Sequence, residues 1–96
     1  MAEKSLSFDR MEHIVNVFGS FDENLHIIEN EMGVTITDRD SALNIFGDAE
    51  NMMYAEKAIE GLLALAAKGE NIDTQNVRYI INLVREGQAE KIAELA

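Results

Sequence analysis

The sequence predicts an α+β domain, in which a small three-stranded antiparallel sheet carries helices on one face and an extra helix follows at the C-terminus. Segments with strand and helix periodicity alternate in the order strand, helix, helix, strand, strand, long helix. The 96 residues, 47% of them hydrophobic, suffice for one compact core. Short strands and helices in this order pack as a sheet covered on one face. We therefore expect a single domain over residues 1–96, with its core at about 5–69 and the additional helix at about 73–96.

The first strand and the first helix are predicted near the N-terminus. Residues 4–8 alternate between polar and apolar side chains, which is the period of a half-buried strand. Asp9 offers an N-cap for the helix that follows, and Gly19 a residue that can end it. Between these two residues the apolar positions recur at helical spacing: Met11, Ile14, Val15 and Phe18.

A second helix is predicted next, because four apolar residues are spaced four, three and four positions apart and would share one helix face. These residues are Phe21, Leu25, Ile28 and Met32. Asp22 and Glu23 fall in the first turn, where negative charge favours the helix dipole. Gly33 can adopt the left-handed conformation that ends the helix.

A β-hairpin follows, with strands at residues 34–37 and 42–46. The first strand is rich in β-branched side chains, and residues 38–41 (DRDS) have the composition of a turn. Gly47 ends the hairpin, and Asp48 offers a side-chain oxygen as the N-cap of the next element.

The long helix is predicted to run from Asp48 to near Gly69. Its apolar stripe consists of Met52, Ile59, Leu62, Leu63 and Ala66. In the pair Met52 and Met53, one side chain is expected in the core, and the other is left undecided.

Asp73 can cap a further helix, whose apolar face must pack against the chain's own long helix, a second copy or another domain. This face consists of Val77, Ile80, Ile81 and Val84, and Ile92 continues the pattern. Gly87 either breaks this helix or is tolerated within it at about 1 kcal/mol relative to Ala.

The charge of the chain argues against tight, autonomous binding of RNA or DNA. Eighteen acidic residues outnumber eight basic ones, for a net charge of −10, and the basic residues form no stripe. Proteins that bind phosphates gain affinity from Lys and Arg, whereas an acidic surface repels the same backbone. We interpret the acidity as a solvated surface that keeps a small domain soluble.

The residue types also exclude most catalytic and metal chemistry. The chain has no Cys, so thiolate nucleophiles and sulfur metal sites are excluded. His13 and His26 have no partner at metal-binding spacing. Residues 38–40 begin like a calcium loop, but Leu43 and Ala49 occupy the positions that require Gly and Glu. We therefore expect no catalytic residue, metal or cofactor in this chain.

The N-terminal 20 residues contain no apolar run of signal-peptide or membrane-span length. We therefore expect a cytoplasmic protein with no membrane partner. The sequence also lacks the G-x-x-x-x-G-K-[ST] pattern, in which a loop wraps phosphate oxygens while a lysine neutralises them. This chain cannot hydrolyse ATP by that mechanism.

Three short motifs resemble a known family in their order and spacing. They are residues 19–25 (GSFDENL), 33–36 (GVTI) and 44–48 (NIFGD), and they resemble the opening, KH-like domain of the PhoH-like ATPases, the phosphate starvation-inducible P-loop proteins. The resemblance spans about residues 5–84. It implies a cytoplasmic protein whose partners are its own ATPase domain, RNA, and further copies in a ring. ATP and magnesium are expected as cofactors of that ATPase domain.

The loop between the first two helices is where the KH module clamps a nucleic-acid backbone with a Gly-x-x-Gly sequence. This chain has Gly19, Ser20, Phe21 and Asp22 there, so a carboxylate that would repel phosphate replaces the second glycine. Gly19, Ser20, Phe21 and the hairpin-tip Arg39 are the candidate contacts with nucleic acid or a protein partner.

Two functions are consistent with these observations. The chain is an accessory domain that positions or regulates an ATPase domain and contributes a weak RNA contact, or it is a protein-binding or oligomerisation module without nucleic-acid affinity. A positive groove assembled from Arg10, Arg39 and Lys57 would favour RNA binding, and an all-negative surface would favour the second function.

Overall fold

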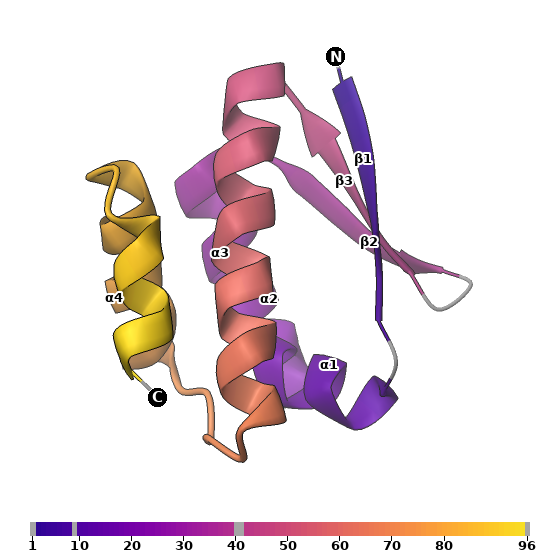
Figure 1. Cartoon of the computed structure of the whole chain (residues 1–96). Coiled ribbons are helices and arrows are strands. Elements are labelled where there is room, and N and C mark those ends of the chain that lie inside the picture. The colour runs from indigo at the N-terminus through magenta and orange to yellow at the C-terminus, as the bar shows by residue number, and fades with distance from the viewer. Residues whose placement is uncertain (1, 9, 40–41, 96) are drawn as a thin grey trace.

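The computed structural model describes residues 2–8, 10–39 and 42–95, and its elements follow the predicted order (Figure 1). The α+β class and the KH-like β-α-α-β-β-α arrangement are confirmed, with two further helical segments after it. The elements are β1 (Ala2–Ser7), α1 (Met11–Phe18), the 3-10 turn η1 (Ser20–Asp22), α2 (Glu23–Met32), β2 (Thr35–Arg39), β3 (Ala42–Gly47), α3 (Ala49–Ala67), α4 (Thr74–Arg85) and the 3-10 segment η2 (Ala89–Leu95).

The three strands form one antiparallel sheet in the order β1-β3-β2. In the central strand, Leu43 and Ile45 are completely buried beneath the helices, opposite Leu6 and Ile36 of the edge strands. Figure 1 shows α3 between the sheet and α4, so the helices lie on one side of the sheet. The alternation of side chains along each strand leaves a second, polar face without helices.

The additional helix packs against its own chain. All four predicted apolar residues of α4, together with Ile92 of η2, are buried in the single core that α1, α2, α3 and the sheet also form. The guanidinium of Arg85 fastens the end of α4 to α2, since it donates to the carbonyl of Glu31 and lies 3.2 Å from its carboxylate. Gly87 has φ +72°, a left-handed conformation that ends the helix. Of the alternatives, the chain's own helices are therefore what α4 packs against.

The predicted apolar face of α2 is wrong at Phe21. Leu25, Ile28 and Met32 are buried as expected, but the side chain of Phe21 is 99% exposed. The helix begins only at Glu23, because Phe21 and the residue after it have φ values of +53° and +57° and cannot continue a right-handed helix. Asn24 takes the buried position near the start of the helix instead.

The buried face of α1 also differs from the predicted one. Ile14 and Phe18 are buried as predicted, together with Val17, whereas Met11 and Val15 are 54% and 63% exposed. Positions 14, 17 and 18 lie on one side of the helix, so the side that faces the core is rotated away from Met11 and Val15.

The predicted caps and turn residues have mixed outcomes. Asp73 caps α4 in a reciprocal capping box with Asn76, as predicted for the cap. Asp48 stands at the N-cap position of α3 but makes no side-chain cap hydrogen bond. Asp9 and residues 40–41 lie outside the described residues. Of the four predicted turn residues, the first two belong to β2.

The methionine pair near the start of α3 divides as expected. Met52 packs against the core, whereas Met53 is 46% exposed. The two methionine side chains therefore lie on different sides of the helix.

Candidate functional site

The turn between α1 and α2 is closed by a tight approach at Gly19. This residue has φ +78° and ψ −179°, a combination that is essentially restricted to glycine. A Cβ atom at this position would lie 2.8 Å from Nδ2 of Asn24, which is closer than such atoms can come. Both the backbone and the packing therefore require glycine here, and Gly19 fixes where the turn begins.

The next residues of the turn hold an aromatic ring in solvent. The backbone N–H of Asp22 donates to the carbonyl of Gly19 at 3.2 Å, and this bond closes the turn around Ser20 and Phe21. Phe21 and Asp22 both have left-handed backbones, which cost a residue with a side chain about 1–2 kcal/mol each. The structure therefore presents an exposed phenyl ring with an exposed carboxylate directly after it.

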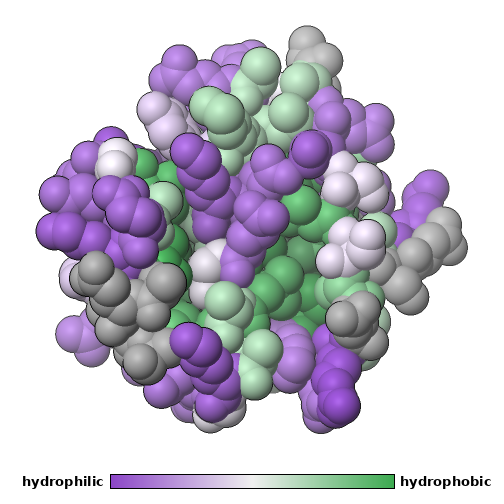
Figure 2. All heavy atoms as spheres, viewed as in Figure 1, coloured by the Kyte–Doolittle hydropathy of each residue, from purple (hydrophilic) through white to green (hydrophobic). Residues whose placement is uncertain are grey.

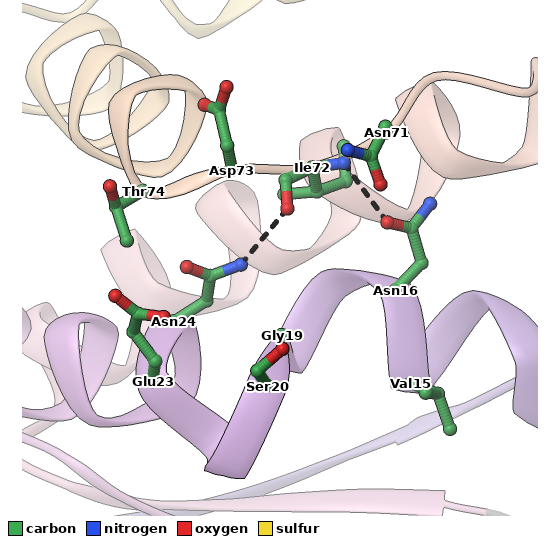
Figure 3. A pocket seen from close by; sticks show the side chains of 10 residues that line it. All are labelled: Val15, Asn16, Gly19, Ser20, Glu23, Asn24, Asn71, Ile72, Asp73 and Thr74. Atoms are coloured by element: carbon green, nitrogen blue, oxygen red, sulfur yellow. Dashed lines mark hydrogen bonds between the residues drawn. The ribbon is translucent and has the colours of Figure 1, made fainter.

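A hollow of about 450 Å³ lies beside this turn, and Figure 3 shows the side chains that line it. They come from α1, from residues 19–24, from residues 71–73 of the connection between α3 and α4, and from the first residue of α4. Glu23 and Asp73 contribute two carboxylates, and none of the lining residues is basic. The hollow is therefore suited to a polar or cationic group and unsuited to a phosphate.

Two asparagine side chains tie the connection between α3 and α4 to the other helices at this hollow. Asn16 donates to the carbonyl of Glu70 at 2.8 Å and accepts from the backbone N–H of Ile72 at 3.0 Å. Asn24, which is 2% exposed, donates to the carbonyl of Ile72 at 3.3 Å (Figure 3). No local pattern predicted these contacts, because they join residues that are 48–56 positions apart in the chain.

The predicted contact residues do not form one site. Gly19 and Ser20 line the hollow beside the turn, and Phe21 projects from the same turn. Arg39 is the last residue of β2 and lines a different hollow, on the helix-free face of the sheet, together with Phe46. Arg39 is therefore separated from the loop that was predicted to act with it.

The basic side chains that could have formed a positive groove are also dispersed. Arg10, Arg39 and Lys57 line three different hollows. Arg10 borders the one between α3, α1 and the end of β1, and Figure 2 shows hydrophobic side chains in the depression beside α3. Its guanidinium donates to the carboxylate of Glu12 at 2.9 Å, and this hydrogen bond and its charge lower the pKa of Glu12 below the ordinary value of 4.5.

A further carboxylate lies at the outer edge of the sheet. Glu29 of α2 accepts a hydrogen bond of 2.9 Å from the backbone N–H of Ile36 in β2, and its other oxygen lies 3.3 Å from Nδ1 of His26. Glu29 is therefore a partly buried acid that joins α2 to β2. The edge amide of Ile36 is already bonded within the chain.

The described part of the chain has neither a candidate metal-binding cluster nor a helix that could span a membrane. Residues 2–8, 10–39 and 42–95 contain no group of three or more acidic, His or Cys side chains that could hold a metal ion. Among the same residues, no helix has the length and apolar character needed to cross a bilayer.

Several bacterial proteins, each named PhoH-like protein, are similar to this chain. The one from Bacillus subtilis is 28% identical over 79 residues, which are 82% of this chain and 25% of that protein. The Mycobacterium tuberculosis protein is 28% identical over 71 residues (74% of this chain, 20% of that protein), and the Mycobacterium leprae protein is 30% identical over 66 residues (69% and 19%). No family model matches the chain, and no solved structure matches it significantly. The chain spans a quarter or less of the length of these relatives.

Proposed function

We propose that this chain is a non-catalytic accessory domain of a PhoH-like ATPase. The basis is that most of the chain is homologous to a segment of the PhoH-like proteins. In this role the domain positions or regulates the ATP-hydrolysing part of a cytoplasmic protein through protein contacts. ATP and magnesium bind that other part, and this chain contributes neither a phosphate loop nor a metal ligand to them.

The observation that carries the proposal is the acidic character of the turn where a KH module grips phosphate. Asp22 occupies the place of the second glycine, and Glu23 and Asp73 line the adjoining hollow, which has no basic side chain. Two like charges 4 Å apart repel by about 1 kcal/mol even in bulk water, and by more near a protein surface. A phosphate backbone is therefore disfavoured in this position, and a protein partner is favoured.

The edge of the sheet restricts how a protein partner can bind. A free strand edge can bind an extended peptide through its backbone amides. The amide of Ile36 is already bonded to Glu29, so we do not expect the partner to add a strand at this residue.

A second candidate function, a weak contact with single-stranded RNA, is favoured by one observation. Phe21 is a fully exposed aromatic side chain in the clamp position, and bases stack on such rings without sequence preference. Its acidic neighbours oppose this function, which therefore ranks below protein docking.

The first test is a fluorescence-anisotropy titration of labelled single-stranded RNA with the 96-residue chain at low and at physiological salt. We expect no saturable binding at either salt concentration. Salt-sensitive binding in the micromolar range would overturn protein docking as the main function and would establish the RNA contact.

The second test is isothermal titration calorimetry of the chain against the Bacillus subtilis relative from which the matched 79-residue segment has been deleted. Retained magnesium-dependent ATP binding serves as the check that this deletion variant is folded. We expect 1:1 binding and a changed rate of ATP hydrolysis. If the chain sediments as a dimer and ignores this partner, self-association would replace regulation as its role.

A further inference from the structure

Phe21 stands apart from the other phenylalanines of the chain. Phe18 is buried, and Phe8 and Phe46 are partly buried, whereas the side chain of Phe21 is 99% exposed. Exposed apolar side chains are normal when they occur singly, but aromatic side chains, Phe among them, are enriched in the cores of protein interfaces.

The backbone that carries the ring is held in a defined turn. The turn that carries it is closed by the bond from the N–H of Asp22 to the carbonyl of Gly19, and Gly19 is itself packed against Asn24. Because both ends of the turn are fixed, little backbone freedom remains to be lost when the ring inserts into a partner.

Two more exposed apolar side chains lie on the adjoining helix. Met11 and Val15 are four positions apart and so share one side of α1, and Val15 and Ser20 line the same hollow. Phe21 and the exposed side chains of Met11 and Val15 on the preceding helix are together named the Phe21 surface.

The charges around the Phe21 surface restrict the chemistry of its partner. Asp22 and Glu23 follow the ring directly, both are exposed, and Asp73 lies across the hollow. A phosphate backbone would be repelled here. A second copy, also with a net charge of −10, would bring a like-charged surface to the contact. A positively charged rim around an apolar pocket is the complementary surface.

We infer that Phe21 anchors a protein-docking surface, with the ring inserted into an apolar pocket rimmed by Lys and Arg on the part of a PhoH-like protein outside the matched segment. This inference rests on the proposed function, since it names the part of the chain that makes the contact. Phe21 supplies the anchor, and Asp22 and Glu23 pair with the basic rim.

The test compares Phe21→Ser with Tyr79→Ser in the calorimetric titration against the segment-deleted Bacillus subtilis relative. Tyr79 is a suitable control, because it is also an exposed aromatic side chain, at 51%, but lies on α4. We expect Phe21→Ser to weaken binding at least tenfold and Tyr79→Ser to change it less than twofold. The thermal midpoint of each variant confirms that the fold is kept.

The charge component is tested with the double variant Asp22→Asn, Glu23→Gln. We expect its affinity to fall several-fold at low salt and to approach that of the unchanged chain at high salt, where screening removes the attraction. If the double variant and the unchanged chain bind with equal affinity at low salt, the inference that the partner's pocket has a basic rim is wrong.

The remaining outcomes separate this inference from the proposed function. Binding that is unaffected by Phe21→Ser overturns the anchor but leaves an accessory domain that docks elsewhere. If the separate proteins do not bind, the test uses a chimera in which this chain replaces the matched segment of the Bacillus subtilis relative. The rate of ATP hydrolysis is then compared between the chimeras that carry Phe21→Ser and Tyr79→Ser. Equal rates there overturn the anchor, and RNA binding that depends on Phe21 overturns both proposals.

Discussion

The backbone N–H of Ile72 donates a hydrogen bond of 3.0 Å to Oδ1 of Asn16, a residue 56 positions earlier in the chain. The same asparagine donates to the carbonyl of Glu70, so one side-chain amide satisfies two backbone groups of the connection between α3 and α4. Asn24 adds a third bond to this connection. The direction in which the chain leaves α3 is thereby fixed, and α4 is placed where its apolar face meets α2 and α3.

The first prediction concerns Asn24. Replacement by Ala removes the donor to the carbonyl of Ile72 and leaves this buried acceptor without that partner, so we expect a loss of about 1–3 kcal/mol in the free energy of unfolding. Urea denaturation measures the loss. Asn30→Ala is the matched control, because Asn30 is an exposed residue of the same helix, and this variant should stay within about 0.5 kcal/mol of the unchanged chain. Equal losses in the two variants would contradict the role of the hydrogen bond.

The second prediction concerns the close packing of Gly61 against Ile92. A Cβ atom on Gly61 would lie 2.7 Å from Cδ1 of Ile92, so Gly61→Ala must displace the isoleucine and loosen η2 on α3. In an Ile92→Ala background the clash is absent, and the same change should stabilise α3 by about 1 kcal/mol through helix propensity. A double-mutant cycle by urea denaturation should therefore give a coupling energy of about 1–2 kcal/mol. Additive effects would show that Ile92 does not pack on Gly61.

The third prediction concerns the carboxyl of Glu12. Arg10 lowers its pKa below 4.5 in the folded chain, so the interaction stabilises the fold above the unfolded pKa and is lost as the pH falls through the folded pKa. An NMR titration of the side-chain carboxyl should give a pKa below the ordinary value, and Arg10→Gln should raise it. Both side chains are well exposed, so we expect the effect on stability to be small. An unchanged pKa in Arg10→Gln would contradict the pairing.

The helices and strands were predicted well from the sequence, because hydrophobic periodicity and capping residues reflect conformational preferences of neighbouring residues. The alternation in the hairpin, the long apolar stripe of α3 and the cap at Asp73 each depend on neighbouring residues only. The same approach failed at Phe21, where regular spacing suggested a helix face. Phe21 and Asp22 have left-handed backbones there instead, in a turn that begins at the closely packed Gly19.

The candidate site was less predictable, because its residues meet only through the fold. The turn at residues 19–22 was identified from its resemblance to a phosphate clamp, and its acidic character was evident from Asp22. The contacts of Asn16 and Asn24 with residues 70–72 span 48–56 positions, and no local pattern encodes them. Arg39 was named as a contact residue for its charge and its place at the predicted hairpin tip, and the sheet places it in a hollow separate from the turn.

The fourth prediction concerns Asp22, whose backbone is left-handed with φ +57°. Glycine adopts this conformation without a Cβ penalty, so Asp22→Gly should raise the free energy of unfolding by up to about 1 kcal/mol, even though the unfolded chain gains entropy. Asp22→Ala should lower it by a similar amount, because alanine tolerates the left-handed region less well than aspartate. Thermal unfolding of both variants measures the difference. If both stabilise the chain, the removed charge and not the backbone determines the effect, and the turn is not strained at this residue.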